Sequence, residues 1–199
     1  LAKYAFWIAL ACILISVQTV LMDKYLMDLF HKIFNASHVI KCITISILSS
    51  IFYGWGLIRR RRFPERVFTN EAKFFLGVLT TAGAIVELGL AVDITPKDFS
   101  WLLLFSYIIY AFLGYFFQSK LIWFFALISL GSWFGVETGY ISGWGSYYLG
   151  MNYPLRFVLF GGILTAAAFM MLEKQKFAIL SQTTLVMGLL YLFIALWIL

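Results

Sequence analysis

Charged residues are scarce in this chain. Only 12% of its 199 residues are charged, whereas 63% are hydrophobic and 20% are aromatic. A soluble domain usually has about a quarter charged residues and about half apolar ones. A single core in a chain of this size cannot hide so much apolar surface from water, so the surroundings must be largely lipid. The composition excludes a cytosolic enzyme, a nucleic-acid-binding domain and a disordered tail.

Residues that carry chemistry are equally scarce. The two histidines, His31 and His38, lie outside the expected spans, so no haem-ligating pair forms across two helices. Cys12 and Cys42 lie in or beside apolar runs, without the paired spacings of a disulfide framework, and are interpreted as small hydrophobic residues. No zinc-protease, nucleophile-elbow or phosphate-loop motif occurs. We expect no catalytic residue, no metal site and no cofactor.

What the sequence has instead is long apolar runs. Their lengths are close to the roughly 20 residues that a membrane-spanning helix needs. None of them alternates apolar and polar residues as the strands of a membrane barrel do. The predicted fold is an all-α integral membrane bundle of about seven helices, a single polytopic domain over residues 1–199. The predicted spans are Tyr4–Met22, Cys42–Ile58, Ala72–Val92, Phe99–Phe117, Leu121–Val136, Leu155–Leu172 and Ile179–Leu199. The fifth span is the shortest, which favours a tight hairpin with the fourth.

The link between the second and third spans is strongly basic, since Arg59, Arg60, Arg61 and Arg62 follow the second span directly. Loops rich in Lys and Arg stay in the cytoplasm, which also predicts a cytoplasmic N-terminus. A nuclear signal or a nucleic-acid patch has a similar string. Directly after a span, we interpret the run as a topology determinant that contacts anionic lipid headgroups.

The segment Asp23–Lys41 has apolar residues at helical spacing on one side and charged residues on the other. This pattern predicts an amphipathic helix that lies in the outer membrane interface.

Ionisable residues within a span are functional candidates by default, because they are costly there. Glu87 in the third span is interpreted either as a proton or cation carrier, or as a carboxylate near the outer interface. The outer loop that begins at Glu137 and includes Asn152 is rich in glycines, aromatics and hydroxyls, and Arg156 follows it. These four residues are candidates for a ligand or ion pocket in which Arg156 pairs with a glutamate. The alternative is an interfacial loop with Arg156 reaching lipid headgroups.

Small residues four positions apart within the spans are typical of close helix contacts in membranes. The pairs Gly77 with Thr81 and Gly162 with Ala166 are predicted to serve such packing.

Short strings follow one another in a recognisable order from Glu71 onward. They are the glycines Gly77, Gly83 and Gly89, the link Gln118-Ser119-Lys120, and the stretch from Thr138-Gly139-Tyr140 to Asn152-Tyr153-Pro154. This order resembles the bacterial predicted-membrane-protein family called domain of unknown function 2157, over about two thirds of the chain. The family typically has a polar residue late in its Gly-rich span, where Glu87 stands. The resemblance implies a helix bundle in the bacterial inner membrane and no assigned activity.

The leading functional hypothesis is a non-enzymatic inner-membrane protein, either an accessory subunit or an assembly factor of a larger membrane complex. Its expected partners are lipids and other membrane subunits, not nucleic acid. The alternative is a small transporter or lipid-handling protein that uses the outer polar pocket. A transferase acting on a lipid carrier would need an outer acidic cluster, for which Asp23 with Asp28 and Asp93 with Asp98 are the candidates.

Overall fold

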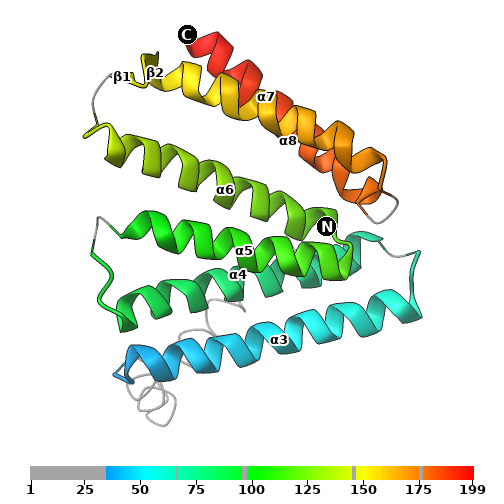
Figure 1. Cartoon of the computed structure of the whole chain (residues 1–199). Coiled ribbons are helices and arrows are strands. Elements are labelled where there is room, and N and C mark those ends of the chain that lie inside the picture. The colour runs from blue at the N-terminus through cyan, green and yellow to red at the C-terminus, as the bar shows by residue number, and fades with distance from the viewer. Residues whose placement is uncertain (1–34, 66, 96–97, 145–146, 175–176) are drawn as a thin grey trace, which may run out of the picture.

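The computed structural model describes residues 35–199, apart from 66, 96–97, 145–146 and 175–176. Within this part of the chain, six helices are long and apolar enough to cross a membrane. They are α3 (His38–Arg62), α4 (Val67–Ala91), α5 (Phe99–Phe117), α6 (Lys120–Ile141), α7 (Tyr153–Leu172) and α8 (Ala178–Ile198) (Figure 1). Such a set of helices is that of a multi-pass membrane protein.

The helices follow the predicted spans, but α3, α4 and α6 extend beyond them, and α4 begins at Val67, before the predicted Ala72. Helix α5 has the predicted bounds, and α6 extends the fifth span to 22 residues, enough to cross a bilayer. Helix α3 begins before the predicted Cys42 and continues through all four arginines, because cations are favourable at a helix C-terminus. The first predicted span, Tyr4–Met22, lies outside the described residues.

The predicted interfacial helix Asp23–Lys41 also lies mostly outside the described residues. Its predicted end is wrong, since His38–Lys41 form the first turn of α3. Ser37 precedes that turn in an extended conformation (φ −61°, ψ 149°), as is usual for the residue before a helix. The backbone changes from extended to helical at Ser37, so α3 begins before Lys41, where the charge pattern placed the end of the interfacial segment.

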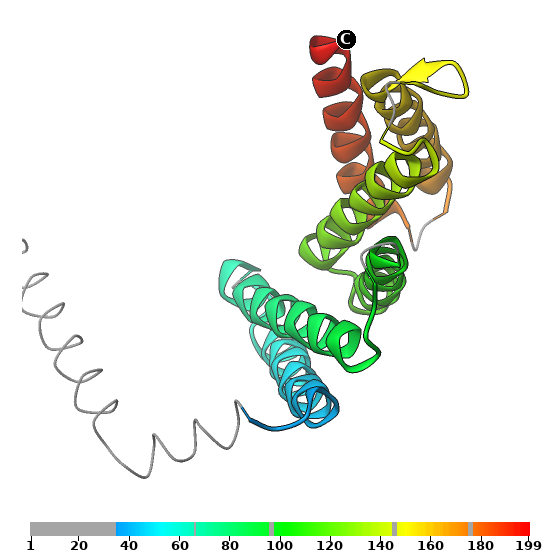
Figure 2. The same ribbon diagram turned by 90° about the vertical axis from the view of Figure 1, so that its left-hand side faces the viewer.

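The six helices form three antiparallel hairpins, α3–α4, α5–α6 and α7–α8, arranged as an open row rather than a closed bundle (Figure 1). Seen along the helices, α4, α6 and α8 lie on one side of the row and α3, α5 and α7 on the other (Figure 2). Helix α6 contacts both α4 and α8. One groove runs between α3 and α5 over α4, and another runs between α5 and α7 over α6 and α8.

Two apolar clusters lie at the two junctions between hairpins. The first contains Tyr53, Phe74, Val78, Tyr110, Ile122 and Ala126. The second contains Leu127, Phe160, Leu164 and Met187. Since α6 contributes to both clusters, it is the central helix of the row.

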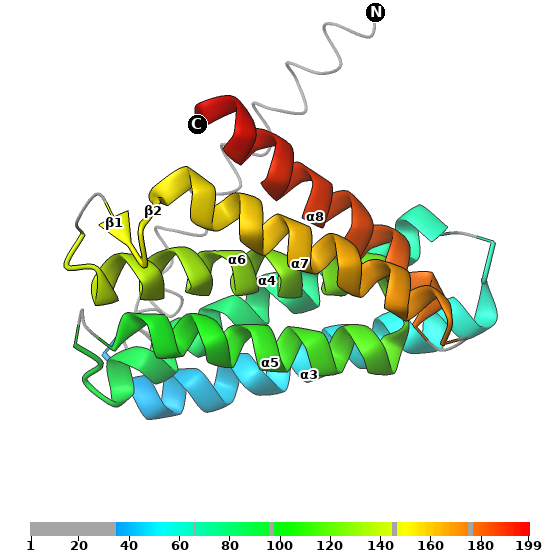
Figure 3. The same cartoon turned by 45° about the horizontal axis from the view of Figure 1, so that its top comes forward.

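Glycines set the closest helix contacts. Helices α7 and α8 pack against each other (Figure 3), and a Cβ atom on Gly161 would lie 2.6 Å from the backbone nitrogen of Leu192. The predicted contact at Gly162 and Ala166 is wrong, since a Cβ on Gly162 has no described atom within 4 Å and Ala166 is exposed. The prediction for Gly77 is confirmed, because a Cβ there would lie 2.7 Å from the ring of Tyr53.

The two adjacent glycines of α7 should therefore respond oppositely to the same substitution. Gly161→Ala should destabilise the protein by about 1–3 kcal/mol, because the new methyl group meets the backbone of α8. Gly162→Ala should leave stability unchanged or raise it by about 0.5–1 kcal/mol, the helix propensity gain. Thermal unfolding of both variants in detergent measures the difference. Equal midpoints for the two variants would contradict the packing described for α7 and α8.

Candidate functional site

The loop between α6 and α7 contains a short antiparallel hairpin that the sequence did not predict. Strand β1 (Tyr147–Tyr148) pairs with β2 (Met151–Asn152). The turn residues Leu149 and Gly150 both have positive φ, 51° and 75°, as in the tight turns that match strand twist. This conformation is unusual for leucine, so the pair lacks the Asn-Gly signal that would have predicted a hairpin.

Asn152 starts α7. Its side-chain oxygen accepts a hydrogen bond from the backbone N–H of Leu155 at 3.0 Å, which satisfies one of the free donors at the helix N-terminus. The predicted binding residue therefore has a local task, since it closes the β-hairpin against the first turn of α7.

Arg156 lies in the first turn of α7 and is only 1% exposed. Its guanidinium donates hydrogen bonds to the carbonyl of Thr138 at 3.1 Å, the carbonyl of Met151 at 3.4 Å and the hydroxyl of Ser142 at 3.5 Å. Thr138 belongs to the last turn of α6, where backbone carbonyls carry partial negative charge. Arg156 therefore caps α6 and fastens the β-hairpin loop to it.

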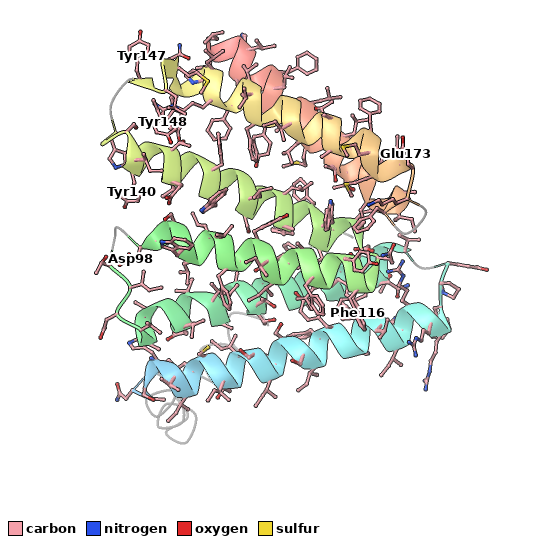
Figure 4. The ribbon with its side chains drawn as sticks, viewed as in Figure 1. Asp98, Phe116, Tyr140, Tyr147, Tyr148 and Glu173 are labelled. Carbon is pink, nitrogen blue, oxygen red and sulfur yellow. The ribbon has the colours of Figure 1, made fainter. Side chains whose placement is uncertain are left out.

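Aromatic rings also contact this cation. The centres of the Tyr148 and Tyr153 rings lie 5.3 Å and 5.5 Å from the guanidinium carbon, within the range of cation–π attraction. Tyr148 lies at the same end of the molecule as Tyr140, Tyr147 and Asp98, opposite Glu173 (Figure 4). The Nη2 atom of Arg156 is buried and has no hydrogen-bond partner among the described residues.

The predicted ion pair between Arg156 and a glutamate does not occur in the described part of the chain. Glu87 instead binds His38, with 2.7 Å between Oε2 and Nδ1. The prediction that both histidines lie outside the spans is wrong for His38, the first residue of α3. Glu137 is half-buried on α6, directly before the residue whose carbonyl Arg156 caps.

The four predicted site residues share one end of the molecule but lie on different hairpins, with Glu87 on α4, Glu137 on α6, and Asn152 and Arg156 at the start of α7. A cavity of about 330 Å³ at this end is lined by α4, α5 and the turn between them. Its lining residues are Val86, Gly89, Leu90, Asp93, Ile94, Phe99 and Leu102. The structure therefore does not bring the four residues into one pocket.

The four arginines at the opposite end have different surroundings. Arg60 donates to the carbonyl of Phe117 at 2.7 Å and to that of Gln118 at 3.4 Å, so it caps the C-terminus of α5. Arg59 lies over the ring of Phe63 at 5.9 Å. Arg61 and Arg62 are exposed, so the predicted contact with lipid headgroups stays a prediction for these two residues.

Lys73 lies within the predicted third span and is a buried residue of α4. Its ammonium lies 3.9 Å from the centre of the Trp55 ring, so an aromatic face of α3 stabilises the charge. Two residues earlier, Glu71 accepts a hydrogen bond from Ser119 at 2.8 Å. These contacts fix the start of α4 against α3 and against the turn between α5 and α6.

A tyrosine accompanies each capping arginine at the junctions between hairpins. Tyr110 of α5 donates to the carbonyl of Val78 on α4 at 3.1 Å. Tyr191 of α8 donates to the carbonyl of Leu127 on α6 at 3.3 Å. Each junction thus has one arginine and one tyrosine bound to the backbone of the neighbouring hairpin, a pattern without a sequence signal because the acceptors are backbone carbonyls.

Comparison of the chain with family models, curated proteins and solved structures finds no match. The resemblance to the domain of unknown function 2157 therefore stays a prediction. In the part of the chain that the structure describes, no three His, Cys, Asp or Glu side chains are grouped to hold a metal ion.

Removing the cap on α6 should destabilise the protein. Arg156→Met should cost about 1.5–3 kcal/mol, because the carbonyls of Thr138 and Met151 lose a charged donor. Arg61→Met removes an exposed arginine and should have little effect. Thermal unfolding and limited proteolysis of the α6–α7 loop measure both variants in detergent. If Arg156→Met were as stable and as protease-resistant as Arg61→Met, the capping role would be wrong.

Proposed function

We propose that the chain is a non-enzymatic subunit or assembly factor of a larger complex in the bacterial inner membrane. The observation that carries this proposal is how little of α3 and α5 is covered. In each helix, only 17% of the residues in the most apolar window are buried within the described chain, against 39% for α4 and α6. Wide uncovered faces on membrane helices are suited to packing against other helices as well as lipids.

The uncovered face of α5 is rich in aromatic side chains. Trp101, Phe112 and Phe116 are each about two thirds exposed, at 65%, 66% and 66%. Phe116 lies in the half of the molecule near the arginine-rich end (Figure 4). Large rigid rings supply much contact area at little cost in conformational entropy, so this face supports a role in binding partner helices.

The internal use of the polar groups supports a non-enzymatic role. Arg156 caps a helix, Asn152 starts one, and Glu87 binds His38. Since these residues lie on different hairpins, the geometry favours the subunit or assembly role over the transporter alternative.

The proposed orientation has the N-terminus and the arginine-rich end in the cytoplasm, and the β-hairpin end outside. Arg61 and Arg62 are exposed beyond the apolar part of α3, where they can contact anionic headgroups. Lys120 and Lys174 lie at the same end of the row, in agreement with the preference of basic residues for the cytoplasmic side.

Native mass spectrometry after gentle extraction from the protein's own membranes tests the subunit proposal. We expect other protein subunits to be released with the chain in fixed stoichiometry. A triple substitution of the α5 face, Trp101→Leu with Phe112→Leu and Phe116→Leu, should reduce that co-release while keeping the face apolar. Release of the 22.8 kDa chain alone, or of a homo-oligomer carrying a defined small molecule, would overturn the proposal.

A further inference from the structure

The groove between α3 and α5 is lined on one side by small and hydroxyl-bearing residues. It has a volume of about 310 Å³, and α4 forms its floor. Its small lining residues are Cys42, Ser46, Ser49, Ser50, Thr81 and Ala84. Small residues let membrane helices approach closely, and hydroxyl groups add hydrogen bonds between them.

Two of these hydroxyl-bearing residues, Ser46 and Ser50, are exposed in the described part of the chain. Both grooves also have large lining side chains, Tyr53 and Phe105 among them in the first. The groove between α5 and α7 differs because Ala167 and Thr184 are its only small lining side chains among the described residues. The small, hydroxyl-bearing wall of α3 is suited to a second helix that packs closely against it.

The chain's first predicted span has a matching face. Within Tyr4–Met22, small residues recur at alternating spacings of four and three, which places them on one side of a helix. They are Ala5, Ala9, Cys12, Ser16 and Thr19. The small residues Cys42, Ser46 and Ser49 of α3 have the same spacing.

The connection between the two segments permits them to pack together. Residues 23–37 join the first predicted span to α3, and 15 residues reach at most about 50 Å. The groove begins at Cys42, one turn from the start of α3. If Met22 and His38 lie at the same level, a helical rise of about 1.5 Å per residue places Cys12 about 15 Å and Ser50 about 18 Å from that level. The two residues then lie within about 3 Å of each other along the helix axes.

We propose that the first predicted span, Tyr4–Met22, occupies this groove antiparallel to α3, with its small-residue face against the hydroxyl-bearing wall. The span then covers the serines of α3 and completes the first hairpin as a three-helix unit. The uncovered face of α5 that carries Trp101, Phe112 and Phe116 is separate from the groove lining and stays available to a partner.

Disulfide cross-linking of the full chain in membranes tests the proposal. In a Cys42→Ser background, the native Cys12 is paired with Ser50→Cys, and a copper–phenanthroline oxidant is added. Disulfides need Cα atoms about 4.4–6.8 Å apart, so only adjacent helix faces react. We expect an intramolecular disulfide, found by mass spectrometry of proteolytic peptides. The matched control is Ile51→Cys, at the next position along α3. Ile51 is 58% exposed and does not line the groove, so a cysteine there should not react.

A second pair checks the register with different substitutions. In a Cys12→Ser background, Thr19→Cys should form a disulfide with the native Cys42. Because the two pairs share no substitution, a misfolded variant in one pair does not decide the result. Absence of both disulfides, equal reaction of Ile51→Cys, or disulfides between two chains in place of within one chain would each overturn the proposal. The last outcome would indicate that a second copy fills the groove.

Discussion

Satisfying backbone carbonyls in a medium without water is the constraint on which the rest of this structure depends. Helices satisfy most of their carbonyls internally, but the last turn of each leaves several free. Arg60 donates to such a carbonyl at the end of α5. Arg156 adds a second hydrogen bond to the Thr138 carbonyl in the last turn of α6, which also accepts from the backbone N–H of Ser142. Tyr110 and Tyr191 donate to carbonyls further along α4 and α6. Each arginine and tyrosine bridges two neighbouring hairpins, so these bonds hold the row together.

The same bonds limit what the polar residues can do. A guanidinium held by two carbonyls and two tyrosine rings is a structural cation, and an asparagine that starts a helix is a structural amide. The polar groups at the β-hairpin end thus stabilise a loop and two helix ends. The helices form an open row (Figure 2), and many large apolar side chains of the described residues are exposed. This combination supports a protein whose contacts with other helices and lipids matter more than an internal site.

How much the sequence could predict depended on where each signal lies. The bounds of α5 followed from hydropathy, because Asp98 and Gln118 flank its apolar run. The bounds of α3 did not, because hydropathy registers arginines as the end of a span although they continue the helix. The polar character of Arg156 was clear, but its partners are backbone carbonyls, which carry no residue identity. Glu87 and His38 are far apart in sequence, and only the α3–α4 hairpin brings them together.

A density map of the protein, taken from its own membranes into lipid nanodiscs without detergent exchange, tests the central claim most directly. The claim is that the guanidinium of Arg156 is bound by backbone carbonyls of the chain itself and that the outer face of α5 binds partners. It predicts helices of another protein against the α5 face, and continuous density from the Arg156 guanidinium to the end of α6. An ordered small molecule bound to Arg156, with only lipid around every helix, would contradict it.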